Sequence, residues 1–76
     1  MKMYIWYCSN TGGQQLLESC ETEDTNDSET NCLKLLKWAK DMIPMLDWER
    51  DDYEQFCATC TENGIDRYFL ANTDNN

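Results

Sequence analysis

Apolar, aromatic and β-branched side chains near the start of the chain predict a β-strand over residues 2–8. Alternation gives this strand two faces, formed by Met3, Ile5 and Tyr7 and by Tyr4, Trp6 and Cys8. Because both faces are apolar, we expect it to lie in the centre of a sheet. Residues 65–72, with the sequence IDRYFLAN, have a similar composition and predict a second strand.

The segment after the first strand has two interpretations. Leu16 and Cys20 share a face if residues 14–21 form a strand, whereas Leu17 joins them if the segment forms two turns of helix. The preceding residues 10–13, Asn-Thr-Gly-Gly, are typical of a tight turn between antiparallel strands, in which glycine supplies a positive φ. We therefore favour a hairpin and leave the helix as the alternative.

A first helix is predicted over residues 28–42. The polar residues 21–31 supply several N-cap side chains, and apolar residues then recur at helical spacing. The apolar positions are Cys32, Leu33, Leu35, Leu36, Ala39, Met42 and Ile43, and the lysines at 34, 37 and 40 fall on the other side. Pro44 is expected to end the helix.

A second helix is predicted over residues 48–63. Asp47 is a suitable N-cap, the acidic residues that follow complement the helix dipole, and Gly64 fits the glycine position after a helix C-terminus. The sequence therefore predicts one α+β domain over residues 1–76. Its architecture would be a two- or three-stranded, mainly antiparallel sheet packed against two helices in the order ββααβ.

The charge balance restricts the class of partner. Fifteen acidic and six basic side chains give a formal charge of −9, which opposes direct binding to nucleic acid or to an anionic membrane and favours a basic protein. No apolar run approaches the roughly 20 residues that cross a bilayer. The five cysteines are an odd number for a disulfide framework, so we expect them to be reduced in a soluble, cytoplasmic protein.

Candidate sites for catalysis or metal binding are weak. Cys57 and Cys60 form a Cys-x-x-Cys pair that could be half of a zinc site, but the chain has no histidine and the pair is expected to pack one helical turn apart in the core. No nucleophile can be combined with a histidine base, and no cleft is expected to perturb the paired carboxylates. We therefore predict a protein that is not an enzyme and has no cofactor.

The residues YIWYCSNTGG resemble the start of flavodoxin-like domains, in which a Ser/Thr-x-Thr-Gly loop holds the flavin phosphate. Ser9, Asn10, Thr11 and Gly12 occupy the matching positions. The rest of the chain is too short for the five-stranded parallel sheet of that fold, and the net charge opposes phosphate binding. The turn interpretation of these residues is therefore favoured.

Acidic residues are gathered in two blocks of the sequence. The first block is Glu18, Glu21, Glu23, Asp24, Asp27 and Glu29, and the second is Asp41, Asp47, Glu49, Asp51, Asp52 and Glu54. Two such blocks on a small body could imitate nucleic acid, which carries one negative charge per about 1.7 Å of duplex axis. The residues expected to contact a basic partner are Glu21, Glu23, Asp24, Asp27, Glu29, Asp47, Glu49, Asp51, Asp52 and Glu54.

In size, acidity and lack of catalytic residues the chain is similar to the small acidic inhibitors that bacteriophages use against host defences, including anti-CRISPR proteins and anti-restriction DNA mimics. This resemblance implies a decoy that blocks the nucleic-acid-binding surface of a defence protein, such as a CRISPR–Cas complex, in the host cytoplasm. The alternatives are a cysteine-ligated zinc module that bridges proteins and a small structural protein that self-associates through exposed aromatic residues. A monomer or a weak homodimer is expected.

Overall fold

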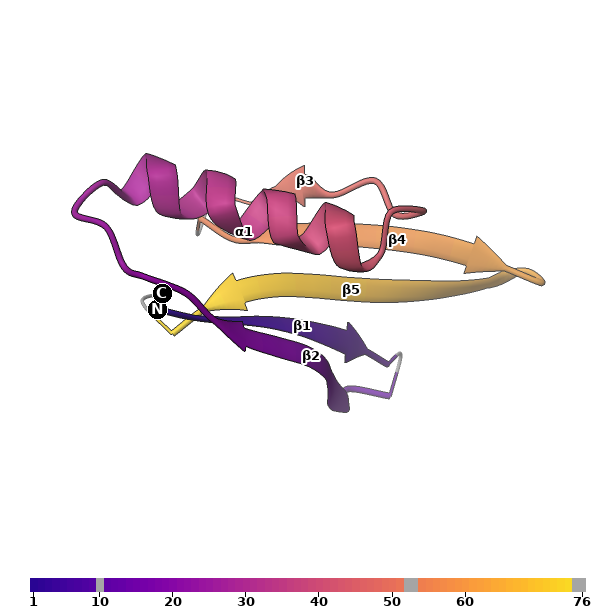
Figure 1. Cartoon of the computed structure of the whole chain (residues 1–76). Coiled ribbons are helices and arrows are strands. Elements are labelled where there is room, and N and C mark those ends of the chain that lie inside the picture. The colour runs from indigo at the N-terminus through magenta and orange to yellow at the C-terminus, as the bar shows by residue number, and fades with distance from the viewer. Residues whose placement is uncertain (10, 52–53, 75–76) are drawn as a thin grey trace.

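The computed structural model describes residues 1–9, 11–51 and 54–74, which form an antiparallel sheet with a helix packed against one face (Figure 1). In chain order the elements are β1 (Lys2–Cys8), β2 (Gln14–Glu21), α1 (Ser28–Met42), β3 (Glu49–Arg50), β4 (Phe56–Glu62) and β5 (Ile65–Thr73). The strands are arranged in the order β2-β1-β5-β4-β3. The last strand in the chain therefore lies at the centre of the sheet, beside the first.

The hairpin predicted at the start of the chain is confirmed. β1 pairs with β2 from Cys8↔Gln14 to Lys2↔Glu21, so residues 14–21 form a strand and not a helix. In the turn, the Ser9 amide donates to the Gly13 carbonyl at 2.9 Å, and Gly12 has a φ of 91°, which only glycine adopts readily. The register of the pair shifts between Ile5 and Trp6 of β1, so the edge strand β2 has a bulge opposite these residues.

The central position predicted for β1 is also confirmed. β1 pairs on its second side with β5, with Ile5 opposite Ala71, and both side chains are fully buried. The strand predicted over residues 65–72 is present and is one residue longer. At its end, the Lys2 amide donates to a carboxylate oxygen of Asp74 at 3.0 Å, so the two ends of the chain are held together.

The helix predicted over residues 28–42 is confirmed as α1. Asp27 is its N-cap, and the helix ends one residue before Ile43, whose amide still donates to the Ala39 carbonyl. The side chains of Leu35 and Ala39 are fully buried between α1 and the sheet. Together with residues of β1, β4 and β5 and of the segment after α1 they form a core of Met3, Ile5, Leu35, Ala39, Leu46, Trp48, Phe56, Ala58 and Ala71.

The second predicted helix is wrong. Residues 49–50 and 56–62 form the strands β3 and β4, so the described residues form five strands and one helix where two helices and two or three strands were expected. Within β4 the period is two and not 3.6, because Phe56 and Ala58 are buried while Cys57 and Thr59 are exposed. The FCATCTE segment also contains threonines, which favour strands.

The physical reason for this error lies in the dipeptide after β4. Asn63 and Gly64 form a two-residue loop between the paired residues Glu62 and Ile65. Their φ values are 54° and 77°, and positive φ at both positions is what a tight hairpin turn requires. A glycine with positive φ also follows many helices, so Gly64 alone did not distinguish a helix C-terminus from a hairpin.

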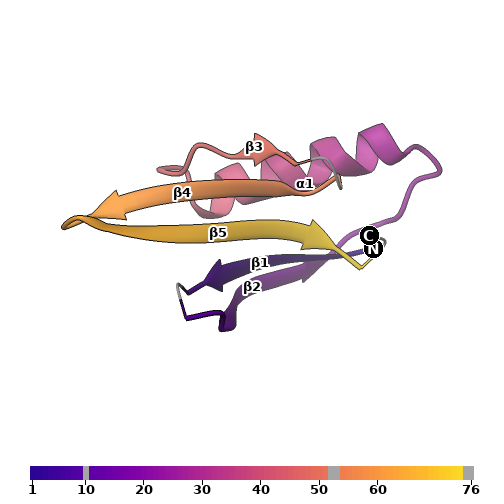
Figure 2. The same ribbon diagram turned by 180° about the vertical axis from the view of Figure 1, so that it is seen from behind.

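Figure 2 shows the molecule from behind, where β3 and β4 lie in front of α1. Because α1 packs against the face that carries Ile5 and Ala71, the opposite face of the sheet is not covered by any described element. Among the described residues, no helix has the length and apolar character needed to span a membrane.

The turn at Gly64 predicts a difference between two glycines. Gly64→Ala should lower the free energy of unfolding by about 1 kcal/mol, because an L-residue is disfavoured at positive φ. Gly13→Ala is the control, since Gly13 lacks such a φ and an added Cβ would lie at an ordinary 3.5 Å from the Ser9 hydroxyl. It should leave stability unchanged or raise it by less than about 1 kcal/mol. Urea unfolding would measure both, and equal losses would contradict the turn assignment.

The burial of α1 predicts a second contrast, between two leucines two positions apart. Leu35→Ala should destabilise the protein by about 2–5 kcal/mol, because it leaves a cavity in the core. Leu33 is 57% exposed, so Leu33→Ala should change stability by less than about 0.5 kcal/mol. Thermal unfolding followed by circular dichroism would compare them. Similar shifts for both variants would mean that α1 packs through a different face.

Candidate partner-binding surface

Several acidic segments meet at one end of the molecule. In Figure 1 the N-terminus and the start of α1 lie at this end. Antiparallel pairing also places the end of β2 and the end of β5 there, beside the start of β1. Residues 51, 54 and 55, between β3 and β4, belong to the same region, because β4 begins opposite the last residues of β5. We call this region the acidic end, and its described residues are 21–29, 51, 54 and 74.

Asn31 organises the loop between β2 and α1. Its side-chain oxygen accepts hydrogen bonds from the Thr25 amide and hydroxyl, and its side-chain nitrogen donates to Asp24 at 3.0 Å and to the Thr25 carbonyl at 3.2 Å. Since Asn31 lies on the first turns of α1, these bonds tie the acidic loop to the helix. The Asp24 carboxylate therefore has a defined position.

Asp27 connects the same loop to the helix start. One carboxylate oxygen accepts from the Glu29 amide at 3.2 Å and the other accepts from the Thr30 hydroxyl at 2.6 Å. These two hydrogen bonds, the one from Thr30 first, hold the pKa of Asp27 below its ordinary value. Asp27 is therefore ionised at neutral pH at the positive end of the helix dipole.

Arg50 joins the two acidic blocks. One of its guanidinium nitrogens donates to both carboxylate oxygens of Glu29, at 3.1 and 3.2 Å, although Glu29 and Arg50 are 21 residues apart in the sequence. The hydrogen bond from Arg50 and the charge of Glu29 together raise the pKa of Arg50. The pair is exposed, so we assign it to positioning and not to stability.

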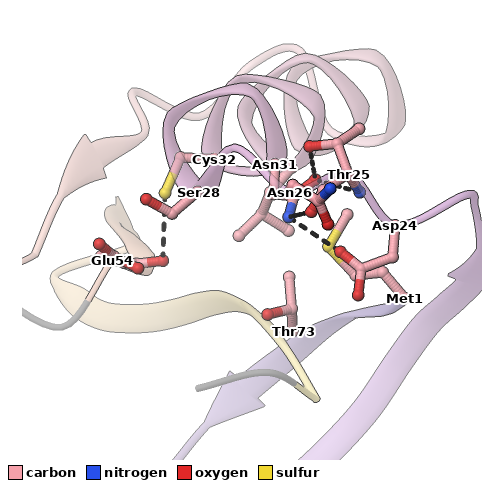
Figure 3. A pocket seen from close by; sticks show the side chains of 10 residues that line it. Met1, Asp24, Thr25, Asn26, Ser28, Asn31, Cys32, Glu54 and Thr73 are labelled. Carbon is pink, nitrogen blue, oxygen red and sulfur yellow. Dashed lines mark hydrogen bonds between the residues drawn. The ribbon is translucent and has the colours of Figure 1, made fainter.

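A pocket lies where the two blocks meet (Figure 3). Its volume is about 260 Å³, and it is open to solvent. Carboxylates from both blocks line it, Asp24 on one side and Glu54 on the other, and Leu35 and Cys32 are also part of its lining. Burial raises the pKa of the Cys32 thiol, whose sulfur lies 3.8 Å from the Glu54 carbonyl oxygen that accepts its hydrogen bond.

The structure brings together most of the acidic residues predicted to contact a partner. The ones at the acidic end are Glu21, Glu23, Asp24, Asp27, Glu29, Asp51 and Glu54. Asp47 lies between α1 and β3, and Glu49 lies on the edge strand β3, so neither belongs to this end. Asp52 falls outside the described residues.

Basic side chains are partly mixed with these carboxylates. The Lys34 ammonium donates to the Glu23 carbonyl at 3.1 Å, and Lys2 lies opposite Glu21 across the β1–β2 pair. Of the three lysines predicted on one side of α1, Lys34 therefore lies beside the acidic residues and not apart from them. Lys37 and Lys40 are exposed on later turns of α1, farther from the acidic end.

Asp74 is an acidic residue of this end that the sequence did not indicate. It is exposed, and besides accepting from the Lys2 amide it donates its own amide to the Lys2 carbonyl at 3.1 Å. No local pattern around residue 74 points to this location. It follows from the pairing of β5 with β1, which joins residues that are far apart in the sequence, from Met3↔Thr73 to Cys8↔Tyr68.

The predicted packing of Cys57 and Cys60 on one helix face is wrong. Both lie in β4, three residues apart, so their side chains point to opposite faces of the sheet, and Cys57 is exposed. They cannot hold one metal ion together as a Cys-x-x-Cys pair. Among the described residues, no group of three or more Cys, Asp or Glu side chains could hold a metal.

The turn that resembles a phosphate loop leads into β2 and not into a helix. Ser9 and Thr11 direct their hydroxyls at each other at 2.9 Å, and the Gly13 amide donates to the Ser9 hydroxyl. Without a helix after the turn, the helix N-terminus that binds phosphate in such loops is missing. Asn10 is outside the described residues. Comparison of the chain with protein-family models, curated proteins and solved structures found no match.

The hydrogen bonds of Asp27 predict a pH dependence. Because the native pKa is lowered, the carboxylate stabilises the fold fully above its ordinary value of 3.8, and this contribution is lost as the pH falls through the native pKa. Asp27→Ala should therefore have a lower urea midpoint than the native chain at pH 7, and the difference should shrink below pH 3.8.

Asp27→Asn is the matched control, because an asparagine side chain still caps a helix but does not titrate. It should retain most of the stability at pH 7 and should not weaken in the same acidic interval. A stability difference between Asp27→Ala and the native chain that is constant with pH would contradict this role of the carboxylate.

Proposed function

We propose that this protein is an acidic decoy that binds the nucleic-acid-binding surface of a basic protein and competes with DNA or RNA for it. The observation that carries the proposal is the meeting of carboxylates from both sequence blocks at the acidic end. The Glu29–Arg50 pair, with its 3.1 Å contact, and the pocket shared by Asp24 and Glu54 bring the two blocks together. The similarity to small phage inhibitors suggests a nuclease or a surveillance complex of host defence as the partner.

The physical argument begins with charge density. These carboxylates are exposed except for Asp51, which is half-buried. Lys2, Lys34 and Arg50 lie among them and offset part of the negative charge that an approaching partner meets. A groove that binds nucleic acid presents lysines and arginines spaced to meet phosphates, and it attracts a clustered acidic surface for the same reason. The association should be fast and should weaken as salt screens the charges.

Order at the acidic end supports the same function. The Asn31 and Asp27 hydrogen bonds fix the loop before α1, and the Asp51 amide donates to the Gln55 carbonyl at 2.7 Å within the loop before β4. Since less conformational freedom is lost on binding when the charges are already positioned, such loops favour affinity. The decoy needs no chemistry of its own, because occupation of the groove is sufficient for inhibition.

The test compares two double variants with equal charge. Glu21→Gln/Glu23→Gln neutralises two exposed residues at the acidic end, and Asp41→Asn/Glu62→Gln neutralises two exposed residues elsewhere. Each removes two negative charges, so both change the formal charge from −9 to −7. Immobilised native chain should capture nucleic-acid-binding proteins from a bacterial lysate at low salt, and added duplex DNA or RNA should release them.

The variant at the acidic end should retain less captured protein than the native chain, by about tenfold or more for two charge contacts. The matched variant should retain nearly as much as the native chain. Equal losses in both variants would mean that net charge and not the acidic end governs the capture. Capture that resists both neutralisation and nucleic-acid competition would exclude the decoy function.

A further inference from the structure

The face of the sheet opposite α1 carries a row of apolar side chains. Leu16 of β2 pairs with Trp6 of β1, Trp6 pairs with Leu70 of β5, and Leu70 pairs with Cys57 of β4. Residues directly opposite each other in antiparallel strands point to the same face, so these four side chains form one row across four strands. Leu16 is 45% exposed even though it belongs to the row.

The rows on either side are also uncharged. Ser19, Tyr4 and Asn72 form one of them, and Gln14, Cys8, Tyr68 and Thr59 form the other. Among the paired residues that the structure describes, the charged ones on this face lie around the three rows: Lys2 and Glu21 beyond one side, Asp66 beyond the other and Glu49 at the end of the apolar row. We call the three rows the open face. An aromatic centre without charge and a charged rim are typical of a protein interface.

The polar atoms of the central aromatic residue are compatible with burial. The Trp6 indole nitrogen donates to the Asn72 side-chain oxygen at 3.1 Å, so this donor would keep its partner in a dry interface. Tyr4 and Trp6 pack with ring centroids 6.0 Å apart, which gives the centre of the face a fixed shape. The open face therefore meets the requirements of a surface that can be covered.

We propose that the open face binds the same face of a second copy of the chain. The charges on this molecule restrict what can cover it. A basic partner would find no carboxylate within the three rows, and a nucleic acid would be repelled by the net charge of −9. A second copy presents the same uncharged surface, and two sheets can stack face to face about 10 Å apart. This inference does not rest on the proposed decoy function.

The area indicates how strong the dimer should be. The face is four strands wide, with strands about 4.8 Å apart, and its three rows span about four residues at about 3.4 Å per residue. With the width of the side chains included, its area is roughly 400 Å² per copy. Stable interfaces bury about 800 Å² per partner. The dimer should therefore be weak and depend on concentration. Electrostatic repulsion between two acidic copies weakens it further.

Salt should strengthen this dimer. Two copies of charge −9 repel each other, and raising the salt from about 0.05 M to about 1 M shortens the screening length to about 3 Å without weakening apolar burial. Binding of a basic partner should change in the opposite direction. The salt dependence therefore distinguishes self-association from the decoy function, and either can fail without the other.

Sedimentation equilibrium of the native chain, from micromolar to about millimolar concentration, would test the proposal. We expect a monomer–dimer equilibrium that tightens with salt. Leu16→Glu should weaken dimerisation by about tenfold or more, because it places a charge in the interface of each copy. Leu33→Glu is the matched control, since Leu33 is also an exposed leucine, on α1, and both variants have the same net charge. It should dimerise like the native chain.

Tyr68→Glu provides a second variant on an interior strand. Tyr68 is 45% exposed and lies on the open face in β5, so this substitution should weaken dimerisation as Leu16→Glu does. Loss with Leu16→Glu alone would assign the contact to the free edge of β2 and overturn the proposal. A native chain that stays monomeric at every concentration would also overturn the proposal, and so would an equal loss of dimerisation with Leu33→Glu. Loss of basic-partner capture by monomeric Leu16→Glu would overturn it as well.

Discussion

The antiparallel pairing of β1 with β5 is the constraint on which the rest of the structure depends. It joins residues near the two ends of the chain, from Met3↔Thr73 to Cys8↔Tyr68, and makes them the central strands of the sheet. Once this pair exists, the β1–β2 and β4–β5 hairpins extend the sheet on both sides. α1 can then bury Leu35 against the fully buried Ile5 and Ala71.

The same pairing creates two different surfaces. It brings the acidic loop before α1, the loop before β4 and Asp74 to one end, where the Glu29–Arg50 pair joins the two acidic blocks. Together with the β1–β2 and β4–β5 pairings, it aligns Leu16, Trp6, Leu70 and Cys57 in one row on the face that α1 leaves uncovered. One surface is suited to electrostatic attraction and the other to apolar contact, so we expect them to respond to salt in opposite directions.

A dimer formed through the open face would have a consequence for the decoy. Because the acidic end begins at Glu21, at the margin of that face, two acidic ends would belong to one assembly. Two linked binding surfaces can engage a long basic groove with higher avidity than one, provided that both reach it. Because the interface area is small, this assembly would form mainly at high local concentration, such as on a shared partner.

Local sequence signals determined the elements with strong periodicity or strong turn chemistry. Residues 2–8, the Gly12 turn, the helix over residues 28–42 and the strand after Gly64 all follow from side-chain pattern, capping and backbone preference within a few positions. Residues 48–63 were mistaken for a helix because positive φ at Gly64 suits both a helix end and a hairpin, and only pairing with β5 decides between them. The acidic composition was evident from the sequence, but the sharing of one pocket by Asp24 and Glu54 was not, nor was the row from Leu16 to Cys57. These arrangements depend on strand order and register, which are fixed by contacts between residues far apart in the chain and are therefore decided only by the tertiary structure.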